Sequence, residues 1–168
     1  MSGTIGINAA HISGFAWGDW SLTKPGYLTF DFTKWKEAVD LGDIGRLSRI
    51  VIHEFTHIFN ADRDSNPKYW SEFQHLAAKQ GVFSSYAGRN NLETLPEVVG
   101  YYVARCAKDN PYDTGKFNDY YEWVKTTIFA GREFGPAPGT KATCDVTPEQ
   151  IPTPEPSTPD WVKALSGE

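Results

Sequence analysis

Residues 43–60 read DIGRLSRIVIHEFTHIFN, and this stretch decides the fold. Asp43 is a residue type that caps helices. Apolar residues recur after it at helical spacing, at Ile44, Leu47, Val51, Phe55 and Ile58. Further apolar residues between them make the helix apolar nearly all round, which is typical of a buried helix. The pattern therefore predicts a long, buried helix that ends at about Asn60.

The same helix carries the motif His53-Glu54-Phe55-Thr56-His57. Side chains four residues apart on a helix lie on one face, with Cβ atoms about 5–6 Å apart. Two imidazoles at that spacing can reach one zinc ion at about 2.0–2.1 Å each. Glu54 would then point at water rather than at the metal and act as a general base. The alternative is a hydrogen-bonded pair of core histidines beside a surface glutamate, and the motif favours the metal.

A catalytic zinc ion usually takes three protein ligands and keeps one position open. The motif does not extend to a third histidine, because Asn60 and Arg63 stand where Gly and His would be needed, and the only methionine is Met1. Both absences argue against the metzincin class. The other histidines are His11 and His75, and His75 on a separate predicted helix is expected to be a packed or surface residue. The third ligand is therefore expected to be a carboxylate of the next long helix.

Residues 84–97 read SSYAGRNNLETLPE. Together with the upstream motif, they resemble the second active-site segment of the anthrax toxin lethal factor catalytic domain and similar gluzincins, which are zincin metallopeptidases. The shared pattern is a Ser-Tyr pair, an Asn four residues on, a Glu three later and a second Glu four further on. The resemblance implies that Glu93 is the third zinc ligand and that the Tyr86 hydroxyl stabilises the oxyanion. It also implies that Glu97 accepts the outer N–H of a zinc-bound histidine.

Pro96 leaves the choice between Glu93 and Glu97 open. Asn90 can be an ordinary helix cap, and Thr94 with Glu97 fits a capping box. Proline is tolerated in the first helical turn but costs about 3 kcal/mol in a helix interior. A helix that begins at residue 91 places Pro96 deep, whereas one that begins near Thr94 lets Glu97 compete as the ligand. The pattern favours Glu93.

The expected fold class is α+β, a zincin-like single domain that is mostly helical with a small N-terminal sheet. Residues 27–32 alternate as in a strand, and residues 12–20 suggest a second strand. Four further helices are predicted. The first is capped by Thr33 and ends at about residue 40, and the second follows Asn66-Pro67 and covers residues 67–80. The last two cover about residues 91–109 and 116–130.

The domain is expected to cover residues 1–134 and to be followed by a Pro-rich tail or linker over residues 135–168. Seven of the 11 prolines fall in that tail, and residues 161–165 could dock as a short helix. Cys106 and Cys144 match no cysteine-based metal site. One buried and one tail thiol are favoured, and a disulfide that ties the tail to the domain is the alternative.

The formal net charge is -5 and basic residues form no cluster, which argues against nucleic-acid and anionic-membrane partners. No apolar run approaches the roughly 20 residues of a membrane helix. The N-terminus lacks the features of a signal peptide. A secreted effector and a cytoplasmic protein both stay open, and we expect a monomer.

These patterns predict a zinc metalloendopeptidase acting on a peptide or protein. The substrate would lie extended against an edge strand, either residues 27–32 or the Gly- and Trp-rich segment before it. Trp17 and Trp20 would shape a specificity pocket or pack in the core. The main alternative is a catalytically inactive zincin-like module that binds zinc or a partner. A metal hydrolase acting on another bond ranks lower, since nothing indicates a phosphate or nucleobase pocket.

Overall fold

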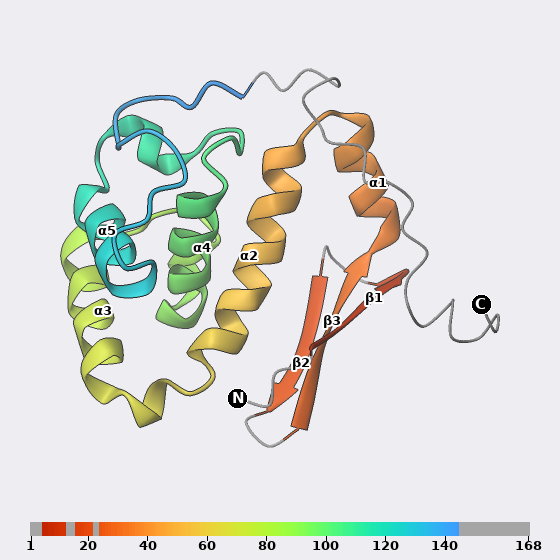
Figure 1. Ribbon diagram of the computed structural model, residues 1–168, viewed down its shortest axis with the longest axis horizontal. Coiled ribbons are helices and arrows are strands. Elements are labelled where there is room, and N and C mark those ends of the chain that lie inside the picture. Colours follow the sequence, from red (N-terminus) through yellow and green to blue (C-terminus); the bar gives the residue numbers. More distant parts are fainter. Residues whose placement is uncertain (1–4, 13–15, 22–23, 145–168) are drawn as a thin grey trace, which may run out of the picture.

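The computed structural model describes residues 5–12, 16–21 and 24–144. Within them a small sheet precedes a set of helices, so the fold is α+β and mostly helical, as predicted. Figure 1 shows the long helix α2 between the sheet on one side and helices α3, α4 and α5 on the other. None of the described helices combines the length and apolar character that crossing a membrane requires.

Three strands form the sheet: β1 (Ile5–Ala10), β2 (Ala16–Ser21) and β3 (Lys24–Asp31). Their order is β1-β3-β2, with β3 parallel to β1 and antiparallel to β2. The predicted strand over residues 27–32 falls in β3, except that Phe32 begins a helix. Strand β3 is paired on both sides and has no free edge. The prediction that residues 27–32 form the edge strand for the substrate is therefore wrong. The segment before it supplies β2, which is an edge strand.

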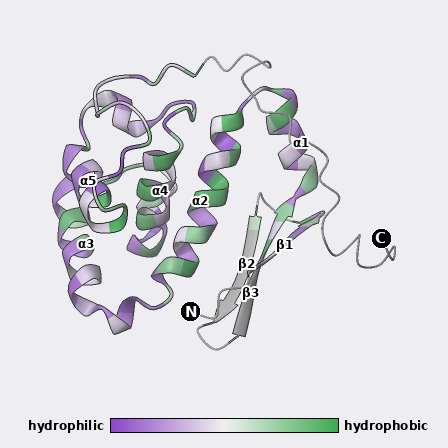
Figure 2. Cartoon of the chain, viewed as in Figure 1, coloured by the Kyte–Doolittle hydropathy of each residue, from purple (hydrophilic) through white to green (hydrophobic). Residues whose placement is uncertain are grey.

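Helix α1 (Phe32–Asp40) begins two residues earlier than a helix capped by Thr33 would. Its cap is Asp31, whose carboxylate accepts hydrogen bonds from the backbone N–H groups of Thr33 and Lys34, so Thr33 is not the cap. Helix α2 (Ile44–Asn60) matches the prediction, and Asp43 caps it by accepting from the N–H of Arg46. Hydrophobic residues recur along the whole of α2, as Figure 2 shows.

Helix α3 (Pro67–Gln80) is capped by Asn66 and ends at Gly81, as predicted. Helix α4 (Asn91–Val103) is six residues shorter than the expected 91–109. The Asn110 amide donates to the carbonyls of Tyr101 and Ala104, which satisfies the end of the helix and turns the chain. The last helix, α5 (Asn118–Trp123), continues as a π-helical turn, Val124–Ile128, within the predicted 116–130.

Two apolar clusters flank α2. The larger is built by α3, α4, α5 and their connections and includes buried Phe73, Leu95 and Tyr112. The smaller joins Leu28 and Phe30 of β3 to Ile50 of α2. The predicted all-round apolar character of α2 therefore has a structural reason, since the helix packs on both of its sides.

The chain beyond Phe134 runs back over this helical part. The buried guanidinium of Arg105 donates to the carbonyls of Pro136 and Thr140, at 3.2 and 3.0 Å. Cys106 and Cys144 form a disulfide, so the favoured expectation of two unpaired thiols, one of them buried, is wrong and its alternative holds. Residues 145–168, with the suggested helix at 161–165, lie outside the described part of the chain.

Candidate metal centre

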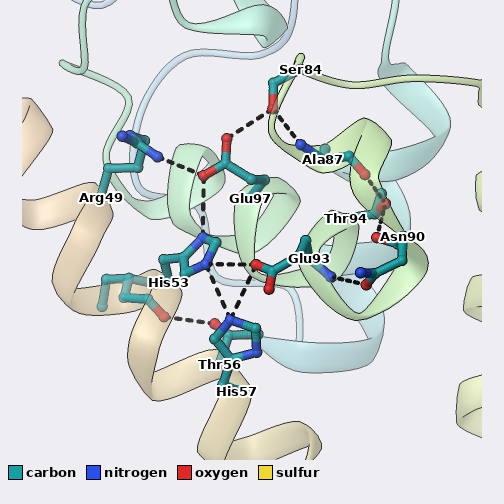
Figure 3. Close-up of polar contacts among 11 residues, drawn as sticks. Arg49, His53, Thr56, His57, Ser84, Ala87, Asn90, Glu93, Thr94 and Glu97 are labelled. Carbon is teal, nitrogen blue, oxygen red and sulfur yellow. Dashed lines mark hydrogen bonds and ion pairs between the residues drawn. The ribbon is translucent and has the colours of Figure 1, made fainter. Parts of the chain in front are cut away.

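The predicted spacing of the histidine pair holds on α2, where His53 and His57 lie on one face of the helix (Figure 3). Their Nε2 atoms are 3.2 Å apart. His53 is buried, with 5% of its surface exposed. Both imidazoles face the first turn of α4, and α2 and α4 are packed directly against each other.

Glu93 comes from that first turn of α4. Its Oε2 lies 3.3 Å from Nε2 of His53 and 3.4 Å from Nε2 of His57. The turn is fixed by Asn90, whose Oδ1 accepts from the N–H of Glu93 at 3.1 Å, and by the Thr94 hydroxyl, which donates to the Ala87 carbonyl at 2.8 Å. Capping side chains thus aim the Glu93 carboxylate at the histidine pair.

These three residues form a group whose ligand atoms suit one metal ion. Ligands at about 2.0–2.1 Å in a tetrahedral zinc site lie about 3.3–3.4 Å from one another, close to the distances observed here. Glu93 Oε2 is also buried without a hydrogen-bond donor among the described residues. A buried carboxylate oxygen aimed at two imidazole nitrogens is costly unless something compensates its charge. The donor set therefore fits a divalent cation such as zinc.

Glu97 lies one turn further along α4 and faces the other side of His53. Its Oε1 accepts from Nη1 of Arg49 at 2.5 Å and from Nδ1 of His53 at 3.1 Å, and its Oε2 accepts from the Ser84 hydroxyl at 2.9 Å. A proton on Nδ1 leaves the lone pair of His53 Nε2 directed at Glu93 and His57. Burial raises the pKa of the Glu97 carboxyl, but His53 and Arg49 outweigh it, and the pKa is lowered.

Pro96 lies inside α4, because the helix begins at Asn91. Of the two competing carboxylates, Glu93 is the one within reach of both Nε2 atoms, while Glu97 contacts His53 at Nδ1. Proline supplies no N–H to the helix. The start of α4 is held instead by the side chains of Asn90 and Thr94, and Pro96 is fully buried against the core.

The pKa values of the two histidines are shifted in opposite directions. Burial lowers the pKa of His53, but the neighbouring carboxylates of Glu93 and Glu97 outweigh burial and raise it. Burial and the neighbouring His53 lower the pKa of His57. His53 in turn lowers the pKa of the Glu93 carboxyl against a smaller effect of burial. The two carboxylates of α4 therefore favour a proton on His53 over a proton on His57.

Glu54 lies beside this group, on the wall of a hollow of about 610 Å³ that His53, Tyr86 and Glu97 also line. It is not among the clustered ligand atoms. Burial raises the pKa of the Glu54 carboxyl, and Glu93 adds to this while His53 opposes it. A carboxylate in this position, at the wall of an open hollow, is suited to exchange a proton with a neighbouring water molecule.

Tyr86 forms another wall of the hollow, with 38% of its surface exposed. Its ring packs edge-on against the His53 ring, with centroids 5.6 Å apart. Burial and the charge of Glu93 raise the pKa of the Tyr86 phenol above its ordinary value. The hydroxyl therefore keeps its proton at neutral pH and can donate a hydrogen bond.

The other histidines lie away from the group. His75 on α3 is exposed, and its Nδ1 is 2.7 Å from the Ser71 carbonyl, so it is a surface residue. His11 contacts Asp31. The side chains of Trp17 and Trp20, and with them the predicted specificity pocket, lie outside the described part of the structure.

Sequence reasoning missed the groups that hold Glu97 and His53 in place. Arg49 is four residues before His53 on the same helix face, and this spacing was an available signal. Ser84 stands 13 residues before Glu97 in a loop, where no local pattern links them. Arg89 at the rim of the hollow was likewise not assigned a role.

Comparison with protein-family models, with curated proteins and with solved structures finds no match for this chain.

Proposed function

We propose that this chain is a zinc-dependent endopeptidase of the zincin type, with His53, His57 and Glu93 as the metal ligands. The observation that carries the proposal is the convergence of the three ligand atoms within 4.8 Å of one another, beside a hollow lined by Glu54 and Tyr86. The resemblance of residues 84–97 to the lethal factor catalytic domain and similar gluzincins supports the same roles.

Zinc in such a site would supply Lewis acidity, polarising a substrate carbonyl and lowering the pKa of a water molecule to about 7. Glu54 accepts the proton of the attacking water. The same carboxyl then returns the proton to the departing amine. Glu54 thus acts as general base and then as general acid.

Tyr86 donates its hydroxyl hydrogen bond to the oxygen that becomes negative during the attack. Glu97, fixed by Arg49 and Ser84, holds the Nδ1 proton of His53 and so keeps its Nε2 lone pair directed at the ligand group. These residues orient the reacting groups.

The alternative is an inactive zincin-like module that binds zinc or a partner. A purely structural zinc site is normally closed, with four protein ligands that are often cysteines. Here both cysteines are in a disulfide, and the ligand group borders an open hollow with a half-buried carboxylate beside it. These features favour catalysis.

Metal content and peptide cleavage test the proposal together. The wild-type protein should bind one zinc ion and cleave members of a mixed peptide library. Glu54→Gln should retain the zinc and lose cleavage. A wild-type protein that binds zinc but cleaves nothing across the library favours the binding-module alternative, and a Glu93→Ala protein with wild-type zinc affinity overturns the ligand assignment.

The Tyr86 role has a test of its own. Tyr86→Phe keeps the ring and removes only the hydroxyl, so zinc content should be unchanged while kcat falls by about 10²–10³, the usual effect of removing one oxyanion donor. Tyr69→Phe, on α3, is the matched control. An unchanged kcat in Tyr86→Phe would show that the hydroxyl does not stabilise the oxyanion and that Tyr86 only packs against its neighbours.

A further inference from the structure

Two arginines line the hollow beside the histidine pair, and they differ in what they contact. Arg49 donates to Glu97, and its guanidinium carbon lies 4.9 Å from the centroid of the Tyr101 ring. Its charge is therefore balanced within the protein. Arg89, an exposed residue at the rim, forms no ion pair with any carboxylate of the described residues.

Arg89 is nevertheless held in place. Its guanidinium carbon lies 4.1 Å from the centroid of the Tyr86 ring, which is a close cation–π contact. Stacking on a ring leaves the edge of the planar guanidinium available for paired hydrogen bonds. Tyr86 is itself packed against His53, so the fixed positive charge lies next to the proposed reaction centre.

The carboxylates that line the hollow do not neutralise the charge of the Arg89 guanidinium. Glu97 uses both of its oxygens on Arg49, His53 and Ser84. Glu54 would repel a substrate carboxylate placed next to it, which confines any attraction for an acidic group to the Arg89 end. The hydroxyls of Ser84 and Ser85 add neutral hydrogen-bonding groups to the wall.

We propose that Arg89 forms a carboxylate-binding subsite, and that the enzyme prefers peptides with an acidic group close to the scissile bond. This inference rests on the proposed peptidase function and names its substrate class. The acidic group can be an Asp or Glu side chain or the C-terminal carboxylate, because both present two oxygens to a guanidinium fork. Pairing with an arginine held by a ring loses less conformational entropy than pairing with a free one.

Matched peptides test the subsite. A peptide cleaved by the zinc-loaded protein is made in three forms: with Glu beside the cleaved bond and an amidated end, with Gln there and an amidated end, and with Gln there and a free C-terminal carboxylate. The wild-type protein should show kcat/KM at least about tenfold higher for one acidic form than for the neutral form, as expected for a charge-assisted hydrogen bond. In Arg89→Gln this ratio should fall to near one.

The matched control is Arg132→Gln. Arg132 is also an exposed arginine stacked on a ring, 5.1 Å from the Phe134 centroid, and it does not line the hollow. It should keep the wild-type ratio. A preference for the Glu form identifies an internal acidic side chain as the ligand, and a preference for the free acid identifies the chain end.

Two results overturn the subsite. One is equal kcat/KM for all three forms, and the other is an acidic preference that survives Arg89→Gln. In both cases cleavage itself still supports the peptidase function. If no peptide is cleaved, the proposed peptidase function is rejected instead. The subsite is then tested by measuring peptide binding.

For the binding measurement, fluorescently labelled forms of one peptide are titrated into the zinc-loaded Glu54→Gln protein. At least about tenfold tighter binding of an acidic form, removed by adding Arg89→Gln, supports the subsite. Equal affinities of the acidic and neutral forms overturn it.

Discussion

The carboxylate of Glu97 accepts hydrogen bonds from three side chains that come from two separate parts of the chain. Arg49 and His53 lie on α2, and Ser84 lies in the loop before α4. With 2% of its surface exposed, Glu97 has little water to replace a lost partner. Glu97 contacts Nδ1 of His53, the ring nitrogen that does not face Glu93, and so holds this proposed metal ligand in its orientation. Substitutions of Glu97 should therefore change the affinity for the metal.

Glu97→Gln should weaken zinc binding by about 10–100-fold, the usual cost of changing a residue that orients a ligand. The amide is neutral, so it loses the ion pair with Arg49, and its NH₂ group cannot accept from the Ser84 hydroxyl. Competition with a chromogenic chelator measures the affinity. Ser84→Ala, which removes one donor and keeps the charge, should show a smaller loss. A greater loss in Glu97→Ala than in Glu93→Ala would reverse the roles of the two carboxylates.

The residues of the site differed in how far they could be predicted. His53, Glu54 and His57 lie within one helical turn, so their spacing defines their relative positions. Glu93 required a resemblance to a known family. The ion pair between Arg49 and Glu97 spans 48 residues and depends on the packing of two helices, which no local pattern describes.

At the scale of elements, the site depends on how closely α2 and α4 approach. Gly100 lies on the face of α4 that meets α2, where a Cβ atom would be 3.1 Å from the Arg49 carbonyl oxygen and 3.3 Å from its Cγ. The missing side chain at residue 100 therefore lets the backbones come together and brings Glu93 and Glu97 within reach of His53.

Gly100→Ala should push the two helices apart, lower the free energy of unfolding by about 1–3 kcal/mol and weaken zinc binding. Urea denaturation and chelator competition measure the two effects. Gly88→Ala is the control, because its Cβ would meet only the side chain of exposed Val82, at 3.2 Å. Equal effects of the two substitutions would show that helix separation is not responsible.

Elements with local signals could be predicted, and those that depend on distant partners could not. Helices α2 and α3 have a capping side chain at the start and regular apolar spacing within. Strand β1 was not predicted, because its short, small-residue sequence gains its structure by pairing with β3. The end of α4 was misplaced because the amide of Asn110, seven residues beyond, closes it.

Asp31 links β3 to α1 and accepts hydrogen bonds from the Thr33 side chain and from the backbone N–H groups of Lys34 and Ile12. These bonds lower the pKa of the Asp31 carboxyl well below its ordinary value. A lowered pKa in the folded protein means that the ionised carboxylate stabilises the fold above about pH 4, its unfolded pKa, and that this stabilisation is lost as the pH falls.

Asp31→Asn should therefore be less stable than the wild-type protein at pH 7, and the difference should shrink as the pH is lowered below about 4. Urea denaturation of both proteins between pH 7 and pH 3 measures it. Asp40→Asn, an exposed position at the end of α1, should show a much smaller difference at every pH. A gap for Asp31→Asn that is constant with pH would mean that its effect is not electrostatic.

At the scale of the whole molecule, the site lies where two halves of the fold meet. Helix α2 lies between the sheet and the helical cluster (Figure 1). It packs against the sheet through Ile50 and against the helical cluster through Ile52, and it carries both histidines. The hollow continues to Ala16 at the start of edge strand β2. A metal ion held by His53, His57 and Glu93 would join α2 to α4, so binding should also stabilise the fold.

The start of α2 is tied to the C-terminal part of the described chain. Gly45 lies so close to the backbone of Cys106 that a Cβ atom there would be 2.4 Å from it. Cys106 is in turn bonded to Cys144, across a sequence separation of 38 residues. A cross-link over a loop of this length stabilises mainly by restricting the unfolded chain, typically by about 2–4 kcal/mol. The disulfide is expected to act on stability and leave the site geometry unchanged.

Replacing both cysteines by serine should therefore lower the free energy of unfolding by about 2–4 kcal/mol, measured by urea denaturation. Zinc affinity and kcat/KM at a temperature where the variant is folded should stay at the wild-type level, because neither sulfur belongs to the ligand group. The reduced wild-type protein is the internal control and should match the double variant. Zinc binding lost along with the disulfide, in a variant that is still folded, would show that the position of α2 depends on this cross-link.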